Sequence, residues 1–211
     1  MARERHTKNP KSSSQPSTLR IIGGRLRGSS IQYHGDRRTR PMKDRVREAA
    51  FNLIGPRIAG SRAVDLFAGT GALAFEALSR GAESALLIER HFPTARLIER
   101  NAEALGVSDR VSVFAGDTFV WARRQQMSND DRGAVARHVV FCSPPYDLYV
   151  TQTQDMLDLI SAVAEQTGPG SILVVESDAR FDTDLLPDCC SWDVRNYPPA
   201  VLAIGRVDDV E

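Results

Sequence analysis

The sequence predicts an α/β fold built on a seven-stranded, mostly parallel sheet with an antiparallel last strand and helices on both faces. From residue 57 onward, apolar runs of strand length alternate with segments of helical periodicity, which is typical of a doubly wound sheet. Glycines stand at expected helix ends, as at Gly81 and Gly106. The last two strands are joined only by Pro198-Pro199. That connection is too short for a crossover helix, so the two strands are expected to be antiparallel.

The expected elements follow in order along the chain. A glycine-turned hairpin is expected at 19–22 and 30–33, and a helix from Asp44 to the Gly55-Pro56 break. Further strands are expected at 63–67, 85–89, 111–114, 139–142, 171–176, 192–197 and 201–207. Further helices are expected at 72–79, 94–105, 119–124 and 152–165, with a polar loop at 125–137.

Composition divides the chain into three parts. Residues 1–18 are rich in Lys, Arg, Ser, Gln and Pro and carry almost nothing to bury, so a disordered basic tail is expected. Residues 19–56 are interpreted as an N-terminal extension and residues 57–211 as the main domain. No apolar run approaches the roughly 18–20 residues of a membrane helix, and no secretory signal follows the N-terminal charges.

Cysteine and histidine usage predicts neither a disulfide framework nor a metal site. The three cysteines, Cys142, Cys189 and Cys190, form no CxxC pair, and the four histidines lack ligand spacing. We therefore expect a monomer without structural metal in a reducing cytoplasm.

The net charge of zero hides a strong asymmetry along the chain. Residues 1–48 contain 13 Lys and Arg against 4 Asp and Glu, a net charge of +9, and residues 49–211 contain 14 against 23, a net charge of −9. A basic head on an acidic body indicates a polyanionic partner for the head. A solvated charged tail is the alternative interpretation.

The segment 65–74 (DLFAGTGALA) carries the sharpest motif. It places G-x-G-x-x-A between an expected strand and an expected helix, with Gly69 for a tight turn and Gly71 for close approach of a ligand. Asp65 favours one ligand class, because its carboxylate repels a pyrophosphate but attracts the sulfonium and ammonium groups of S-adenosylmethionine. This segment therefore predicts a site for that methyl donor, and Phe67 is counted among its cofactor-binding residues.

Two further acidic residues follow the next two strands. Glu89 ends its strand 18 positions after Gly71, close to the roughly 20-residue offset at which an acidic side chain meets a ribose diol. Asp117 follows the third strand, where it can accept a hydrogen bond from an adenine amino group or cap the helix that follows.

The segment Ser143-Pro144-Pro145-Tyr146 follows the fourth strand of the main domain. Two prolines fix the backbone and remove two N–H donors, which is expected to leave carbonyls aimed outward. Such acceptors can hold an exocyclic amino group with its lone pair toward a methyl donor, while Tyr146 stacks on the base. Catalysis then consists largely of holding the amine and the sulfonium methyl carbon in line. These four residues are the predicted catalytic set.

Together these motifs resemble those of the RsmD family. Asp65–Gly71 with Ser143–Tyr146 are similar to amino-methyltransferases that carry a [DNS]PP[YFW] motif, and the N-terminal segments are specific to RsmD. The segments concerned are Arg20–Gly28 (RIIGGRLRG), Arg40–Glu48 (RPMKDRVRE), Phe67–Leu73 (FAGTGAL) and Glu76–Ala82 (EALSRGA). The resemblance implies a Rossmann-like class I methyltransferase fold and methylation of guanine N2 in bacterial 16S ribosomal RNA. It also implies cofactor contacts from Asp65, Gly69, Gly71, Glu89 and Asp117, and guanine contacts from Ser143–Tyr146.

Ser143 departs from the family pattern, which usually has Asp at this position. Serine is neutral and shorter, whereas a charge-assisted hydrogen bond from aspartate is roughly twice as strong as a neutral one. The SPPY form also occurs in cytosine-N4 DNA methyltransferases. Two alternatives therefore stay open: a DNA cytosine-N4 or adenine-N6 methyltransferase, which the lack of a separate target-recognition domain disfavours, and a catalytically weakened RNA-binding assembly factor.

Arginines of the basic head are the expected RNA contacts. Phosphate contacts of this kind make binding strongly salt-dependent, and arginine also stacks on splayed bases. A base that must leave its stack to reach the prolines needs its flanks held. The residues predicted to bind RNA are Arg20, Arg25, Arg27, Arg40, Arg45 and Arg47.

Overall fold

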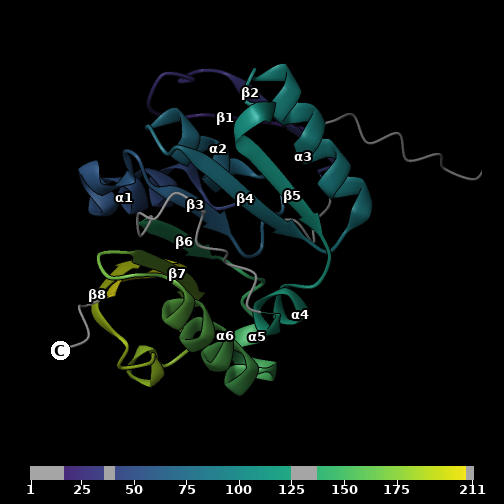
Figure 1. Cartoon of the computed structure of the whole chain (residues 1–211). Coiled ribbons are helices and arrows are strands. Elements are labelled where there is room, and N and C mark those ends of the chain that lie inside the picture. The colour runs from purple at the N-terminus through teal and green to yellow at the C-terminus, as the bar shows by residue number, and fades with distance from the viewer. Residues whose placement is uncertain (1–16, 36–40, 125–136, 208–211) are drawn as a thin grey trace, which may run out of the picture.

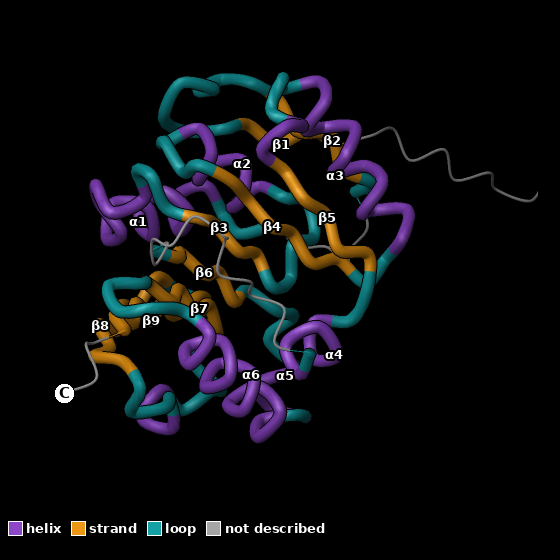
Figure 2. Tube along the Cα trace, viewed as in Figure 1, coloured by secondary structure: helices purple, strands orange, loops and turns teal. Residues whose placement is uncertain are grey.

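A computed structural model describes residues 17–35, 41–124 and 137–207. Its seven-stranded sheet has the order β5-β4-β3-β6-β7-β9-β8, and helices cover both faces (Figure 1, Figure 2). Neighbouring strands from β5 to β7 are parallel, whereas β9 runs antiparallel between β7 and β8. The predicted fold class, including the antiparallel last strand, is confirmed.

The elements of the sheet lie close to the expected ranges. Its strands are β3 (Arg62–Asp65), β4 (Ser84–Glu89), β5 (Val111–Ala115), β6 (His138–Cys142), β7 (Ile172–Asp178), β8 (Cys190–Tyr197) and β9 (Ala200–Val207). The short connection between β8 and β9 contains a cis peptide bond between the two prolines. The expected loop at 125–137 lies outside the described residues except for Arg137.

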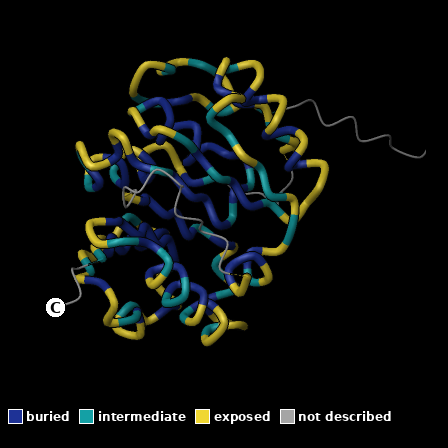
Figure 3. Tube along the Cα trace, viewed as in Figure 1, coloured by how far each residue is buried: buried dark blue, intermediate teal, exposed yellow. Residues whose placement is uncertain are grey.

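Two layers of helices enclose the sheet. Alternate residues of its strands pack into two hydrophobic cores, one on each face. On one face lie α1 (Asp44–Ile54), α2 (Ala72–Ser79) and α3 (Phe92–Ala104), with the 3₁₀ helices η1 (Gly55–Ile58) and η2 (Ser108–Arg110). On the other lie α4 (Thr118–Arg123), α5 (Leu148–Thr151) and α6 (Thr153–Gln166), with η3 (Thr183–Leu185) beyond β7. Phe141 of β6 packs in the first core and Val140 in the second. The inner strands of the sheet are largely buried, whereas the edge strands β5 and β8 are more exposed (Figure 3).

The N-terminal hairpin is confirmed, but its first strand begins earlier than expected. It pairs β1 (Ser17–Arg20) with β2 (Ser30–Tyr33) in a separate two-stranded sheet. The backbone amide of Ile22, which was expected to lie in the strand, and that of Gly23 donate instead to the two carboxylate oxygens of Glu76 in α2, each at 2.8 Å. Strand pairing therefore ends at the residues that the α2 side chain binds.

The N-terminal extension shares the core of the main domain. Ile21, Ile31 and Phe51 pack in the same buried cluster as α2 and the sheet. On α3, the Asn101 side chain accepts from the Gln32 amide at 3.1 Å and donates to the Gln32 carbonyl at 2.8 Å. Asn101 thus takes the place of a neighbouring strand for β2, and the composition boundary at residue 56 is not a boundary in packing.

Arg47 is fully buried between the extension and α2, contrary to its predicted role in RNA binding. Its guanidinium donates to the Arg20 carbonyl at 2.7 Å and to Asp44 at 3.0 Å, and its Nε lies 3.9 Å from Glu76 Oε2. Glu76 is 0% exposed as well. Helical spacing explains the correction, because Arg47 lies on the same face of α1 as Ala50, Phe51 and Ile54, which the core buries.

Glu76→Ala is expected to destabilise the fold by about 3–5 kcal/mol, since breaking a buried ion pair leaves the other charge unpaired. The substitution also removes the acceptor for the Ile22 and Gly23 amides. Equilibrium urea unfolding measures the change. The exposed Glu83→Ala is the matched control and should shift stability by less than about 0.5 kcal/mol. Equal stabilities of the two variants would contradict this account of Glu76.

Candidate active site

The two predicted motifs lie at the ends of adjacent parallel strands. Asp65, the last residue of β3, is paired in register with Phe141 of β6, two residues before Ser143. Strand order reverses here, because the chain runs from β3 to β4 and β5 on one side and then returns to β6 and β7 on the other. The carboxyl edge at such a switch point is where open α/β sheets bind their ligands. The geometry therefore brings the two motifs together at the carboxyl edge of the sheet, at its switch point.

Asp65 is a buried carboxylate whose oxygens lack a hydrogen-bond partner among the described residues. It is 1% exposed, and neither carboxylate oxygen forms a hydrogen bond with a described residue in good geometry. Burial raises the pKa of Asp65 to about 7, the nearby Phe67 backbone amide lowers it in part, and the charge of Glu89 raises it further. An isolated buried carboxylate is costly unless a cation or donor accompanies it. This site therefore suits a cationic ligand.

The loop after Asp65 turns tightly at two glycines. Gly69 and Gly71 have φ of 51° and 77°, the left-handed region that glycine tolerates best. A Cβ on Gly71 would lie 2.8 Å from Phe75 Cε2 and 3.2 Å from Leu87 Cδ2. Gly71 therefore suits this turn on two grounds, its left-handed φ and the side chains of Phe75 and Leu87 that fill the space of a Cβ.

Glu89 holds the glycine loop in place. One carboxylate oxygen accepts from the Gly69 amide at 2.9 Å and the other from the His91 amide at 2.7 Å. Each carboxylate oxygen has a further lone pair, so the arrangement is compatible with the predicted ribose contact. Sequence reasoning did not foresee that Glu89 also ties β4 to the loop after β3.

Asp117 caps α4, as one of its two expected roles required. Its Oδ1 accepts from the Val120 amide at 3.0 Å, so the cap uses one carboxylate oxygen. The predicted adenine contact stays a prediction. Beside it, the rings of Phe67 and Phe119 meet edge to face at 6.2 Å, which places an aromatic pair at the same end of the sheet.

The proline segment differs in one respect from its expected form. The Pro145 carbonyl accepts from the Leu148 amide at 2.9 Å, so it belongs to the turn that opens α5 and is not aimed outward. The Pro144 carbonyl accepts no hydrogen bond from a described residue. Only one of the two expected acceptors is therefore available, and α5 itself was not predicted.

Glu176 of β7 is the site residue that sequence reasoning missed. It is 5% exposed and accepts hydrogen bonds from the hydroxyls of Ser143 and Tyr146, the latter at 2.7 Å. Burial raises the pKa of Glu176, and the two hydroxyl donors lower it in part. The available signal was an acidic residue near the end of an apolar strand, the same signal that marked Glu89.

Two buried groups lie between the motifs. The Cys142 thiol and the Tyr149 hydroxyl are 3.6 Å apart. Burial raises the pKa of Cys142 to about 12, and the pKa of Tyr149 also lies well above its usual value because of burial. Both groups are therefore neutral at ordinary pH and add no charge beside Asp65 and Glu176.

The predicted RNA-binding arginines do not form one cluster. Arg45 is exposed and donates to the Pro198 carbonyl at 2.6 Å, in the β8–β9 turn at the carboxyl edge of the sheet. Arg25 and Arg27 are exposed near Ser79 at the far end of α2, and eight helical residues rise about 12 Å. Arg20 is exposed on β1, and Arg40 lies outside the described residues.

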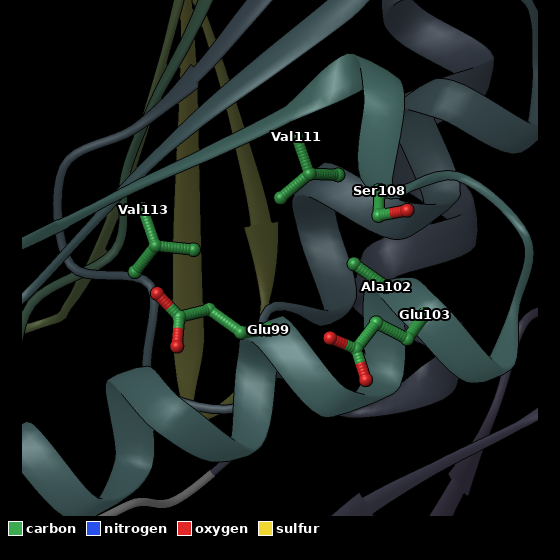
Figure 4. Close-up of a pocket in the computed structure, with 6 residues that line it drawn as sticks. All are labelled: Glu99, Ala102, Glu103, Ser108, Val111 and Val113. Atoms are coloured by element: carbon green, nitrogen blue, oxygen red, sulfur yellow. The ribbon is translucent and has the colours of Figure 1, made fainter.

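Other features of the described residues do not compete with this site. A hollow between α3 and β5 is lined by Glu99, Ala102, Glu103, Ser108, Val111 and Val113 (Figure 4). It lies toward the amino end of β5, away from the carboxyl edge. The part of the chain that the structure describes has no cluster of metal-ligating side chains. Among those residues, no helix has the length and apolar character to span a membrane.

Comparisons with known proteins agree with this geometry. The family described as conserved hypothetical protein 95 matches residues 19–196. The chain is 35% identical over 170 residues to ribosomal RNA small subunit methyltransferase D of Escherichia coli K12, which covers 80% of this chain and 79% of that protein.

Solved structures show the same fold. One described as "Putative methyltransferase yhhF from Escherichia coli" has a TM-score of 0.73 at 25% identity and covers 91% of this chain and 99% of that chain. An RNA methyltransferase from Salinibacter ruber, solved with S-adenosyl-L-homocysteine, has a TM-score of 0.57 at 20% identity and covers 82% of this chain and 96% of that chain.

Asp65→Asn is expected to stabilise the ligand-free protein above pH 7. The folded carboxyl keeps its proton up to about pH 7, whereas in the unfolded chain it loses the proton near 3.8. Stability of the wild type therefore falls as pH rises between these values, by up to about 4 kcal/mol at about 1.4 kcal/mol per pH unit. The variant lacks this loss.

Urea unfolding of both proteins from pH 5 to pH 8 measures the difference, which should grow with pH. The exposed Asp109→Asn serves as the control and should change stability by less than about 0.5 kcal/mol. A difference that stays constant across the pH range would refute the burial argument for Asp65.

Proposed function

This chain belongs to the RsmD family, the family described as conserved hypothetical protein 95, and on that premise we propose that it methylates N2 of a guanine in 16S ribosomal RNA. S-adenosylmethionine is the methyl donor, as its class I methyltransferase fold indicates. Methylation of ribosomal RNA is the activity named for its relatives; guanine N2 and the 16S molecule are the finer part of the proposal. A ribosomal RNA substrate supports the proposal that the enzyme acts in the cytoplasm.

The observation that carries this proposal is the juxtaposition of Asp65 and Ser143 on paired strands. β3 and β6 are hydrogen-bonded neighbours with Asp65 opposite Phe141. The Asp65 carboxylate, which suits a cation, and the proline segment therefore lie at the same carboxyl edge of the sheet. Methyl transfer to an amine needs the amine nitrogen and the methyl carbon held in line. Neighbouring strand ends supply that arrangement.

The donor fits the residues at the β3 end of the site. The unpaired carboxylate of Asp65 suits its cationic groups, the glycine turn at Gly69 and Gly71 is proposed to pass close to it, and Glu89 is proposed to bind its ribose hydroxyls. Phe67 and Asp117 are proposed to meet the adenine. When bound, S-adenosylmethionine supplies an electrophilic methyl group on a sulfonium.

The target base is proposed to enter over the proline segment. Pro144 contributes the backbone carbonyl that no described residue occupies, and Ser143 contributes a side-chain oxygen beside it. The Tyr146 ring offers a stacking surface, which is worth about 1–3 kcal/mol per base in single-strand binding. The base must be turned out of its stack to reach this position.

The test supplies isotopically labelled donor to the protein with undermethylated small ribosomal subunits and maps the modified nucleotide. Label at N2 of one 16S guanine is expected. Label on cytosine or adenine amino groups, or none with intact donor binding, would overturn the proposal. Asp65→Asn is expected to lose donor affinity in calorimetry by more than 100-fold, about 2.7 kcal/mol, although the variant folds; unchanged affinity would remove the donor assignment.

Arg25, Arg27 and Arg45 are proposed to hold the RNA, so replacing all three with Glu is expected to raise the KM for RNA at least tenfold while leaving donor affinity intact. Phosphate contacts also steepen the salt dependence of binding, and the variant should show a shallower slope. Arg45→Glu alone should carry the larger share because it lies nearest the site.

The matched control replaces Arg57, Arg100 and Arg206 with Glu, the same change in charge at other exposed positions. Enzyme assays across a salt series compare the two triple variants. Similar RNA affinities for both would show that overall charge, rather than the extension, governs binding.

A further inference from the structure

Glu176 is a buried carboxylate that has no role in the proposed function so far. It is 5% exposed and pairs with the hydroxyls of Ser143 and Tyr146, and no salt bridge joins it to a basic side chain within the described residues. Burying a carboxylate without a cation is unfavourable. A merely structural role is served at lower cost by a neutral side chain, so the charge itself calls for an explanation.

The hydrogen bond from Ser143 has a consequence for the target amine. A serine hydroxyl has one proton and two acceptor lone pairs. Because the proton is donated to Glu176 Oε2, the lone pairs of Ser143 Oγ remain for other donors. Ser143 is partly exposed, whereas Glu176 is almost completely covered. The serine oxygen is thus the exposed end of a pair whose charge lies beneath it.

We propose that Glu176 is a positioning residue that acts through Ser143, so that the two side chains together do the work of a single aspartate at position 143. Glu176 fixes the hydroxyl proton away from the substrate and polarises Oγ, which then accepts a hydrogen bond from the exocyclic amine. This inference rests on the proposed amine methylation and deepens it. It also accounts for the serine without a loss of activity.

The same pair provides a route for the proton that the reaction releases. The amine nitrogen forms a bond to the methyl carbon while the carbon–sulfur bond of the donor breaks, and the nitrogen gains one positive charge. One N–H proton then passes to Ser143 Oγ as the hydroxyl proton of Ser143 passes to Glu176 Oε2. The methylated amine leaves neutral, the sulfur leaves as a thioether, and Glu176 holds the proton until it returns to water.

The environment of Glu176 agrees with this use. Burial raises its pKa above the ordinary value for glutamate, and the hydroxyls of Ser143 and Tyr146 lower it only in part. A carboxylate with a raised pKa holds a proton better than an exposed one does.

The decisive experiment is single-turnover methylation of small-subunit RNA by Glu176→Gln and by the double variant Ser143→Asp/Glu176→Gln. The single variant keeps the shape of the side chain but loses its charge, and we expect its rate to fall about 100-fold, as for loss of a general base. Donor affinity should be unchanged. The double variant returns the charge to position 143, and at least tenfold recovery is expected.

The pH profile separates this role from simple support of the fold. The wild-type rate should fall as acid protonates Glu176, and that acid limb should be absent in Glu176→Gln. A readout without turnover is carboxyl carbon NMR of Glu176 in the free protein, whose pKa should rise in Ser143→Ala because a stabilising hydroxyl is lost.

The control variant is Glu165→Gln on the exposed face of α6, which should methylate at the wild-type rate. A Glu176→Gln rate equal to that of Glu165→Gln, or no recovery in the double variant, would overturn the proposal. An unmoved Glu176 pKa in Ser143→Ala would do the same. Failure of the wild type itself to methylate the RNA would instead overturn the proposed function, so the two failures are distinguishable.

Discussion

The parallel pairing of β3 with β6 is the constraint on which the site depends. Hydrogen bonds between these strands fix Asp65 opposite Phe141, and a one-residue slip would turn each of their side chains to the other face. Both strands are buried, so the register is held by two cores at once. The distance between the glycine loop after β3 and the proline segment after β6 is therefore set by the sheet. The loops themselves determine only which side chains lie at each strand end.

A second constraint joins the N-terminal extension to this frame. Glu76 accepts from two backbone amides of the extension and lies beside Arg47 and Arg80, so α2 carries the glycine turn at its start and the anchor of the extension near its end. The described part of the extension is thereby held at a fixed place relative to the glycine loop after β3. Within it, Arg45 on the first turn of α1 donates to the Pro198 carbonyl in the β8–β9 turn, at the carboxyl edge of the sheet.

The sequence predicted the sheet well because its signals are local. Apolar runs and turn glycines mark each strand and helix, and the short proline link marks the antiparallel pair. Asp65, Glu89 and Ser143 could be proposed as site residues because each lies at or just after the end of a strand. Arg47 was misread because its charge suggested a surface position, whereas burial depends on Glu76, 29 residues away. Glu176 was missed because its partners, Ser143 and Tyr146, lie about 30 residues earlier, and pairings over such distances leave no periodic pattern.

The two buried carboxylates at this edge are suited to different ligands because their surroundings differ. Asp65 has no side-chain donor and is forced toward neutrality by burial, so it gains most from a ligand that brings a positive charge. Glu176 already has two hydroxyl donors that share its charge, so it gains little from a cation and presents its charge through an oxygen instead. A neutral amine is best recognised by such an acceptor, and a sulfonium by the unpaired carboxylate. Under the proposed function, the environment of each carboxylate, rather than its identity, directs the electrophile to β3 and the nucleophile to β6.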